Sequence, residues 1–192
     1  MIFAAAGAAI LLCALVLWLA FYDSGTLSGT PTLTIETPDK RDPGDAGEFS
    51  LDVTLSELGA AVYPAASFSI HFDRSRLEFL GIGEGELCIT GDGSPALPEW
   101  SVNVDRSNRD GSIDIMYLDI TGGKYAFSRG ISENRGDTVV LRLRFRLRGT
   151  ARSGDVYGIE FTDAVFAASD ERRSLAMANG TLRVRGAKIV VK

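Results

Sequence analysis

After residue 31, apolar and polar side chains alternate along most of the chain. The alternation is clear over residues 48–55 and 66–72, and clearest over residues 139–148, where four arginines occupy every second position. A period of two puts successive side chains on opposite faces of a strand, so each segment is predicted to be a strand with one buried face. Further strands are predicted at residues 33–37, 77–82, 100–104, 112–119, 157–166 and 181–185, the last with an extension toward residue 191.

Clusters of Gly, Asp, Asn and Pro separate these segments, and no segment after Tyr22 has a helical period. Nine strands joined by turn-forming residues predict an all-β domain, an antiparallel β-sandwich. No helix is predicted within this domain. The polar segment from Asp105 to Asp114 is predicted to be a hairpin loop.

The N-terminal segment has a different composition, because no residue from Ile2 to Tyr22 is charged. At about 1.5 Å per residue, a helix of that length spans roughly the hydrocarbon core of a bilayer. Aromatic residues gather at its end, where rings favour the membrane interface. We therefore predict one transmembrane helix over residues 1–22, a flexible linker over 23–31 and the sandwich over 32–192. A cleaved signal peptide is the alternative, although residues 19–23 form a poor cleavage site.

Charge and composition exclude several classes of protein. The formal net charge of −5 argues against a nucleic-acid partner, which needs a basic surface. One histidine and two cysteines are too few for an ordinary zinc or copper site. Cys13 lies inside the apolar segment and Cys88 far outside it, so they form no disulfide framework. No metal or other cofactor is predicted.

The order of the segments resembles that of cohesin modules. Residues 71–82 (HFDRSRLEFLGI) are similar to the tyrosine-aspartate-proline-x-x-leucine-glutamate segment of that family. The other segments that fall in cohesin order are Asp42–Asp45 before the 48–55 strand, Gly85–Leu87, Ile113–Gly122 (IDIMYLDITG), Thr138–Arg148 and Phe161–Val184. The resemblance covers about residues 32–186.

This resemblance implies a nine-stranded jelly-roll sandwich and a non-catalytic function. Cohesins bind calcium-loaded dockerin modules and so hold polysaccharide-degrading enzymes in complexes or on cell surfaces. Ala65 and Ser67 occupy positions where dockerin-binding cohesins carry polar residues such as Asn and Asp. The partner-binding residues that we predict are Ser67, Ser69, His71, Asp119 and Tyr125. A carbohydrate-binding module and a structural domain of an envelope complex are the alternatives.

The four arginines between residues 142 and 148 have two interpretations. They could bind an anionic polymer or lipid headgroups, or they could form cross-strand ion pairs with Glu48 and Asp52. We favour the ion pairs, because the cohesin order makes the two strands neighbours. This strand belongs, in cohesins, to the sheet away from the dockerin surface.

His71 is the single imidazole available as a catalytic base. A catalytic histidine needs a cleft, a nucleophile and an orienting carboxylate, whereas strand alternation places His71 on an outward face. No catalytic residue is therefore predicted. Trp100 and Tyr117 share the parity of apolar neighbours and are predicted to lie in the core, which leaves Tyr125 as the exposed ring that could stack on a sugar.

Overall fold

The computed structural model describes residues 30–37, 47–56, 58, 61–83, 85, 100–121, 125–128, 139–149, 151–169, 176–178 and 180–192. The predicted transmembrane helix, most of the predicted linker and both cysteines lie outside these ranges. Within them, no helix is both long and apolar enough to cross a membrane.

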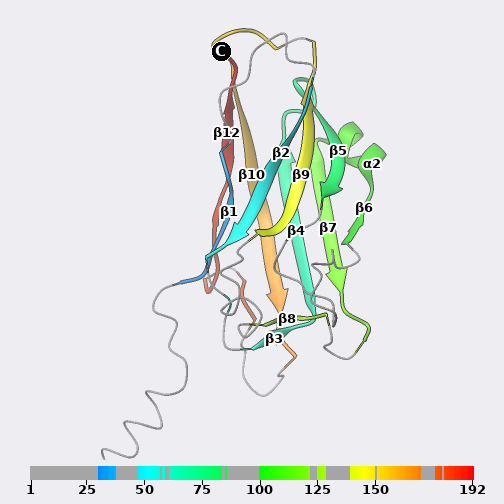
Figure 1. The fold of residues 1–192 in the computed structure, drawn as a ribbon, viewed down its shortest axis with the longest axis vertical. Coiled ribbons are helices and arrows are strands. Elements are labelled where there is room, and N and C mark those ends of the chain that lie inside the picture. The colour runs from blue at the N-terminus through cyan, green and yellow to red at the C-terminus, as the bar shows by residue number, and fades with distance from the viewer. Residues whose placement is uncertain are drawn as a thin grey trace, which may run out of the picture.

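Two five-stranded sheets pack face to face (Figure 1). The first sheet has the order β11 (Arg183–Arg185), β1 (Thr32–Ile35), β2 (Glu48–Leu55), β9 (Val139–Leu147), β5 (Leu77–Gly83). The second has the order β12 (Ala187–Val190), β10 (Val156–Ala167), β4 (Ala65–Phe72), β7 (Ser112–Leu118), β6 (Trp100–Val102). Two short strands, β3 (Val62–Tyr63) and β8 (Phe127–Ser128), pair at the end of the sandwich opposite the C-terminus (Figure 1). The predicted all-β sandwich is confirmed.

Apolar side chains from the inner faces fill the space between the sheets. Phe68, at the centre of β4, is fully buried and contacts the rings of Trp100 and Phe166, with centroid distances of 5.3 and 5.4 Å. Phe145 of the first sheet meets Phe72 of the second at 5.5 Å. Burying such large rings supplies much of the driving force for folding, so the two sheets form one continuous core.

The described part of the chain contains twelve strands instead of the nine predicted. The two-residue strands β3 and β8 are too short to have a detectable period. The predicted C-terminal strand divides at Gly186 into β11 and β12, which belong to different sheets. In addition, β11 pairs with β1 in parallel, so the predicted antiparallel pairing is wrong at this edge.

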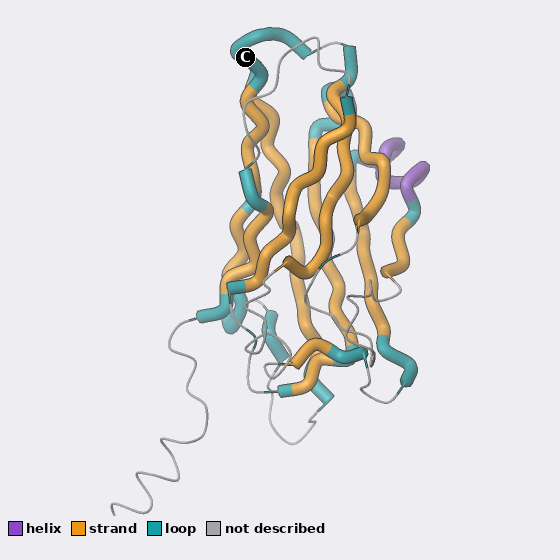
Figure 2. The backbone as a smooth tube through the Cα atoms, viewed as in Figure 1, coloured by secondary structure: helices purple, strands orange, loops and turns teal. Residues whose placement is uncertain are grey.

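The segment predicted as a hairpin loop contains a helix, α2 (Val104–Asp110). The side chain of Asn103 caps its first turn by accepting a hydrogen bond from the Arg106 N–H at 2.9 Å. Gly111 ends it in the left-handed conformation, with φ of 73°. A helix of seven residues is too short for its period to be detected in the sequence. The capping residues Asn103 and Gly111 were the features that could have indicated it. The helix is purple in Figure 2, beside β6.

Asn108 fastens α2 to β5. Its Oδ1 accepts a hydrogen bond from the Phe79 N–H, and its Nδ2 donates one to the Phe79 carbonyl, both at 2.8 Å. We expect Asn108→Ala to lower the free energy of unfolding by about 1–3 kcal/mol, because two partly buried backbone groups lose their partner. Urea denaturation measures this loss. Arg109→Ala, on the exposed side of the helix, is the control, and equal losses in the two variants would contradict this role.

Candidate functional site

The outer face of the second sheet is the surface on which three of the predicted partner-binding residues meet. Strand β4 lies between β10 and β7, and the registers of the two pairings define four rows of side chains across these strands. From the β3 end to the α2 end, the rows are Ala167, Ala65 and Leu118; Val165, Ser67 and Met116; Asp163, Ser69 and Asp114; and Glu160, His71 and Ser112.

The two rows nearest β3 are apolar except for Ser67. Met116 and Leu118 are 57% and 56% exposed, and Ile120, just after β7, is 84% exposed. Between these residues and β10 lies a hollow of about 140 Å³, lined mainly by apolar side chains that include Ala65 and Val165. Large apolar side chains that gather on a surface in this way are typical of a protein contact site.

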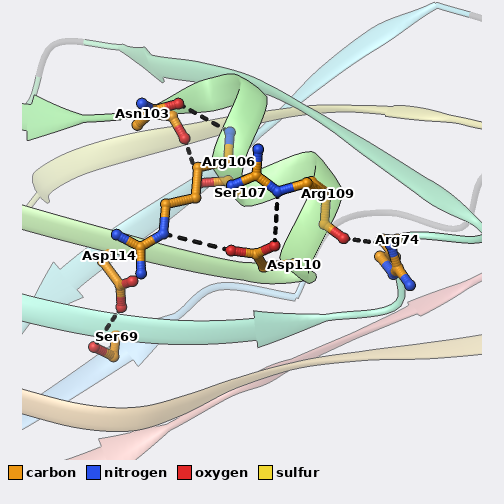
Figure 3. A network of polar contacts seen from close by, with 8 residues as sticks. All are labelled: Ser69, Arg74, Asn103, Arg106, Ser107, Arg109, Asp110 and Asp114. Atoms are coloured by element: carbon orange, nitrogen blue, oxygen red, sulfur yellow. Dashed lines mark hydrogen bonds and ion pairs between the residues drawn. The ribbon is translucent and has the colours of Figure 1, made fainter.

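The rows nearest α2 are polar. The Ser69 hydroxyl donates a hydrogen bond to Asp114 Oδ1 at 2.9 Å. Arg106 extends from α2 toward this strand, and its Nε pairs with Asp110 at 3.4 Å (Figure 3). A second hollow, of about 360 Å³, opens between α2 and β7, and its polar lining residues are Ser67, Ser101, Asn103, Arg106, Ser107, Ser112 and Asp114.

The structure separates the five predicted partner-binding residues into two groups. Ser67, Ser69 and His71 lie together on β4, where Ser67 and His71 are exposed and Ser69 is half-buried. Asp119 and Tyr125 lie in the connection after β7. Only the first group is part of the four rows.

Asp119 is 9% exposed, and its contacts order the chain around it. Its Oδ1 accepts hydrogen bonds from the Thr121 N–H at 2.8 Å and the Thr121 hydroxyl at 2.5 Å, and its Oδ2 accepts one from the Tyr125 N–H at 3.3 Å. The Tyr125 carbonyl accepts a hydrogen bond from the Tyr117 hydroxyl at 2.6 Å. Asp119 therefore holds Thr121 and Tyr125 in place after β7, and little of its side chain is available to a partner.

The rings considered for sugar stacking lie mostly inside. Tyr117 is 2% exposed and Trp100 packs against the core, as predicted. Tyr125 is half-buried. Across the described part of the chain, no three His, Cys, Asp or Glu side chains group in a way that could hold a metal ion.

Sequence reasoning missed Met116, Leu118 and the acidic side chains of the face. Residues 115–118 are four consecutive apolar residues, so their sequence alone does not distinguish the buried side from the exposed side. Asp114 could have indicated the exposed side, because a charged residue is expected to face the solvent. Residues 116 and 118 lie two and four positions after it and therefore on the same face of the strand.

The arginines of β9 lie on the outer face of the first sheet, and the predicted ion pairs are confirmed. Arg142 Nε lies 3.0 Å from Asp52 Oδ1, and Arg144 Nη2 lies 2.7 Å from Glu48 Oε2. A third pair, which was not predicted, joins Arg146 to Glu78 at 3.6 Å. Each of the three arginines thus has a carboxylate partner on a neighbouring strand.

The ion pair with Arg144 makes the contribution of Glu48 to the stability of the folded state depend on pH. The hydrogen bond and the charge of Arg144 lower the pKa of Glu48 below its ordinary value of 4.5. A lowered pKa stabilises the folded state above that ordinary value, and the stabilisation is lost as the pH falls through the lowered pKa. We expect Glu48→Gln to be less stable than the wild type in urea at pH 7, with the difference shrinking toward pH 3. Ser50→Ala, on the same face of β2, should show no such trend, and a difference for Glu48→Gln that is independent of pH would contradict the pair.

Comparison with known proteins agrees with this architecture. The sequence model of the Cohesin domain family matches residues 31–184. Among curated protein sequences, none matches the chain.

Several solved structures are similar. A type I cohesin from Clostridium thermocellum, solved in complex with a dockerin, is 18% identical, with a TM-score of 0.63 over 85% of this chain and 100% of that one. The third ScaC cohesin of Acetivibrio cellulolyticus, in complex with the ScaB dockerin, is 15% identical, with a TM-score of 0.61 over 84% and 98%. A non-cellulosomal cohesin from the archaeon Archaeoglobus fulgidus is 10% identical, with a TM-score of 0.55 over 85% and 92%. At these identities the similarity establishes the fold.

Proposed function

The chain belongs to the cohesin domain family, and on that premise we propose that its sandwich is a non-catalytic module that binds a dockerin-like protein. The proposed contact surface is the outer face of β10, β4 and β7. The observation that carries the proposal is the exposure of Met116, Leu118 and Ile120 beside an apolar hollow. A protein partner would remove these side chains from water, which favours association.

The architecture of the sheet supports contact through side chains. Strands β10, β4 and β7 each have a hydrogen-bonded neighbour on both sides, so their backbones offer no free edge to a partner strand. A partner must therefore lie across the face and pack against its side chains. Ala65 and Ser67 are small, which allows such a partner to approach the sheet closely.

We propose further that the partner is the dockerin of a polysaccharide-degrading enzyme and that an N-terminal membrane anchor displays the sandwich outside the cytoplasm. The uncharged segment from Ile2 to Tyr22 motivates the anchor. Fractionation of cells expressing the full chain should place it in the membrane fraction, and external protease should digest the sandwich in intact cells. Recovery in the soluble fraction would contradict the anchor and leave the binding proposal standing.

The binding proposal is tested by titrating the full chain, in detergent, with a panel of calcium-loaded dockerin modules in a calorimeter. We expect at least one dockerin to bind at a stoichiometry of one to one. The alanine variant of Ser67, Ser69 and His71 together should bind that dockerin more weakly. No binding across the panel would overturn the proposal.

The polar hollow beside α2 favours a second candidate function, the binding of a polysaccharide. Its hydroxyl groups, together with Asn103, Arg106 and Asp114, could form hydrogen bonds with a sugar. Calorimetric titration of the same protein with plant and cell-wall polysaccharides tests this candidate. Heat of binding that Asp114→Ala removes would support it, and no heat with any polysaccharide would exclude it.

A further inference from the structure

A third hollow lies at the end of the sandwich that carries the C-terminus (Figure 1). It opens between the turn from β4 to β5 and the loop from β9 to β10, and it is lined by Ser75, Arg76, Gly149, Ala151 and Arg152. We propose that this arginine hollow binds an anionic polysaccharide through the carboxylate or phosphate groups of its sugars. The site lies apart from the face of β10, β4 and β7, so the inference goes beyond the proposed function.

Hydrogen bonds fix both sides of the arginine hollow. The Arg148 N–H donates to the Arg76 carbonyl at 2.7 Å, which joins the loop to the turn. Within the loop, the carboxylate of Asp155 accepts hydrogen bonds from the Arg152 N–H at 2.9 Å and from the Tyr157 hydroxyl. A site whose backbone is already ordered loses less conformational entropy when a ligand binds. The hollow is therefore formed before its ligand arrives.

This end of the sandwich is positively charged, although the chain as a whole has a formal net charge of −5. Residues 73–76 and 148–155 contain four arginines and two aspartates, which gives a formal charge of +2. The carboxylate of Asp73 accepts hydrogen bonds from the N–H and the hydroxyl of Ser75. Neither Asp73 nor Asp155 is among the described lining residues, so a ligand meets mainly the arginines. Such a local positive field attracts anions.

Two arginines at this end form no ion pair with the described residues. Arg148 directly follows β9, and its Nε donates to the Leu77 carbonyl at 3.2 Å, whereas the three arginines within β9 pair with carboxylates. Because Leu77 follows the lining residue Arg76, the Arg148 side chain lies beside the hollow. The side chain of Arg152 is exposed. Guanidinium groups bind carboxylate and phosphate oxygens through parallel hydrogen bonds, so both side chains are suited to an oxyanion.

The volume of the arginine hollow suits a sugar that carries an anionic group. It is about 570 Å³, larger than the two hollows described above, and falls in the range of roughly 300–1,000 Å³ that is typical of small-molecule sites. A carboxylate or phosphate group fills only part of this space, so the remainder can hold the sugar ring. Gly149 and Ala151 add little bulk, and a Cβ at Gly149 would meet nothing within 4 Å.

The arginine hollow lies at the opposite end of the sandwich from the point where the chain enters it. At the entry, Leu33 of β1 pairs with Leu55, the last residue of β2. Glu48, the first residue of β2, pairs with Arg146, two residues before Arg148. The length of β2, roughly 24 Å, therefore separates the entry from the hollow. The anchor proposed above would direct the hollow away from the membrane, which favours a polysaccharide over lipid headgroups.

The first test measures the binding of polysaccharides to the full chain, in a neutral detergent, by calorimetry. Dextran phosphate carries phosphate groups, polygalacturonate carries carboxylates, and unmodified dextran is the neutral control. We expect at least one of the anionic polymers to bind, which identifies the anionic group, and we expect binding to weaken as the salt concentration rises. Binding of neither anionic polymer, or equal binding of neutral dextran, would overturn the proposal. So would binding confined to vesicles that contain phosphatidylglycerol, because the ligand would then be a lipid surface.

The second test locates the ligand in the arginine hollow. Arg148→Gln with Arg152→Gln removes two positive charges there, and Arg183→Gln with Arg185→Gln removes two from the exposed strand β11 at the entry end. We expect the first variant to bind the anionic polymer about 10-fold more weakly and the control to bind it like the wild type. Equal affinities of the two variants would overturn the assignment of the site.

The single variant Arg152→Gln separates binding from folding. Its side chain is exposed, so the variant should unfold in urea like the wild type while it binds the anionic polymer about 3-fold more weakly. An affinity equal to that of the wild type would contradict the role of Arg152. A dockerin that binds in the calorimetric panel should bind this variant normally, because the four rows contribute no residue to the arginine hollow. Failure of every dockerin to bind would therefore refute the proposed function and leave this site standing.

Discussion

Leu118→Asp is expected to weaken dockerin binding by about 30-fold or more, the effect of losing a hot-spot contact residue. Leu118 is 56% exposed in the row that it forms with Ala167 and Ala65, and it lines the apolar hollow. A carboxylate there would be buried by the partner without a counter-ion, which adds a desolvation cost to the lost apolar contact. The dissociation constant from calorimetry measures the effect.

The exposure of Leu118 also separates binding from folding. Because the side chain is half in water, the variant should keep the wild-type free energy of unfolding to within about 0.5 kcal/mol. Val184→Asp is the matched control, since Val184 is 44% exposed on the other sheet. It should bind the dockerin normally. If Val184→Asp and Leu118→Asp lost the same affinity, the contact surface would have to lie elsewhere.

Gly186→Ala is expected to be strongly destabilising, with a loss of about 3 kcal/mol. A Cβ at this position would lie 2.3 Å from the Ile159 carbonyl oxygen and 3.1 Å from the Glu160 Cα. Both atoms belong to the backbone of β10, so the clash cannot be relieved by rotating a side chain. Thermal unfolding should show a fall of roughly 6–12 °C for a domain of this size.

Gly149→Ala provides the comparison for Gly186. A Cβ at Gly149 would meet nothing within 4 Å. The φ of Gly149 lies outside the left-handed region, so an alanine can adopt it without strain. Its stability should match or slightly exceed that of the wild type, because alanine restricts the unfolded chain. A Gly186→Ala variant as stable as Gly149→Ala would show that β12 can move away from β10 without cost.

Individual strands were the easiest part of the fold to predict. Strand β9, for example, has a buried residue at each of Leu141, Leu143 and Phe145 and a half-buried arginine between them, as its alternation predicted. The helix α2 was missed, because its seven residues are too few to show a helical period in the sequence. Its two capping residues, Asn103 and Gly111, are the features that specify it. The division at Gly186 was missed for a different reason: each side of the glycine has a strand pattern, and the sheet that each strand joins depends on distant partners.

The candidate site was predicted in part. Alternation placed Ser67, Ser69 and His71 on the outward face of one strand, and all three lie there. The family resemblance added Asp119, whose side chain is mostly out of solvent and accepts hydrogen bonds from Thr121 and Tyr125. The row that contains Asp163 and Asp114 needed the register of three strands and a bulge in β10, none of which a single segment specifies.

The sequence by itself determined the family, the all-β class and the buried side of the clearly alternating strands, such as β2, β4 and β9, because these follow from local periodicity and from the order of segments. The tertiary structure decided which strands are neighbours, and with them the change from apolar to polar rows across the outer face. Asp163 and Asp114 are 49 positions apart in the chain, yet they flank the same serine. Register between strands is set by packing of the whole core, so the surface that a partner would meet emerges only when both sheets have formed.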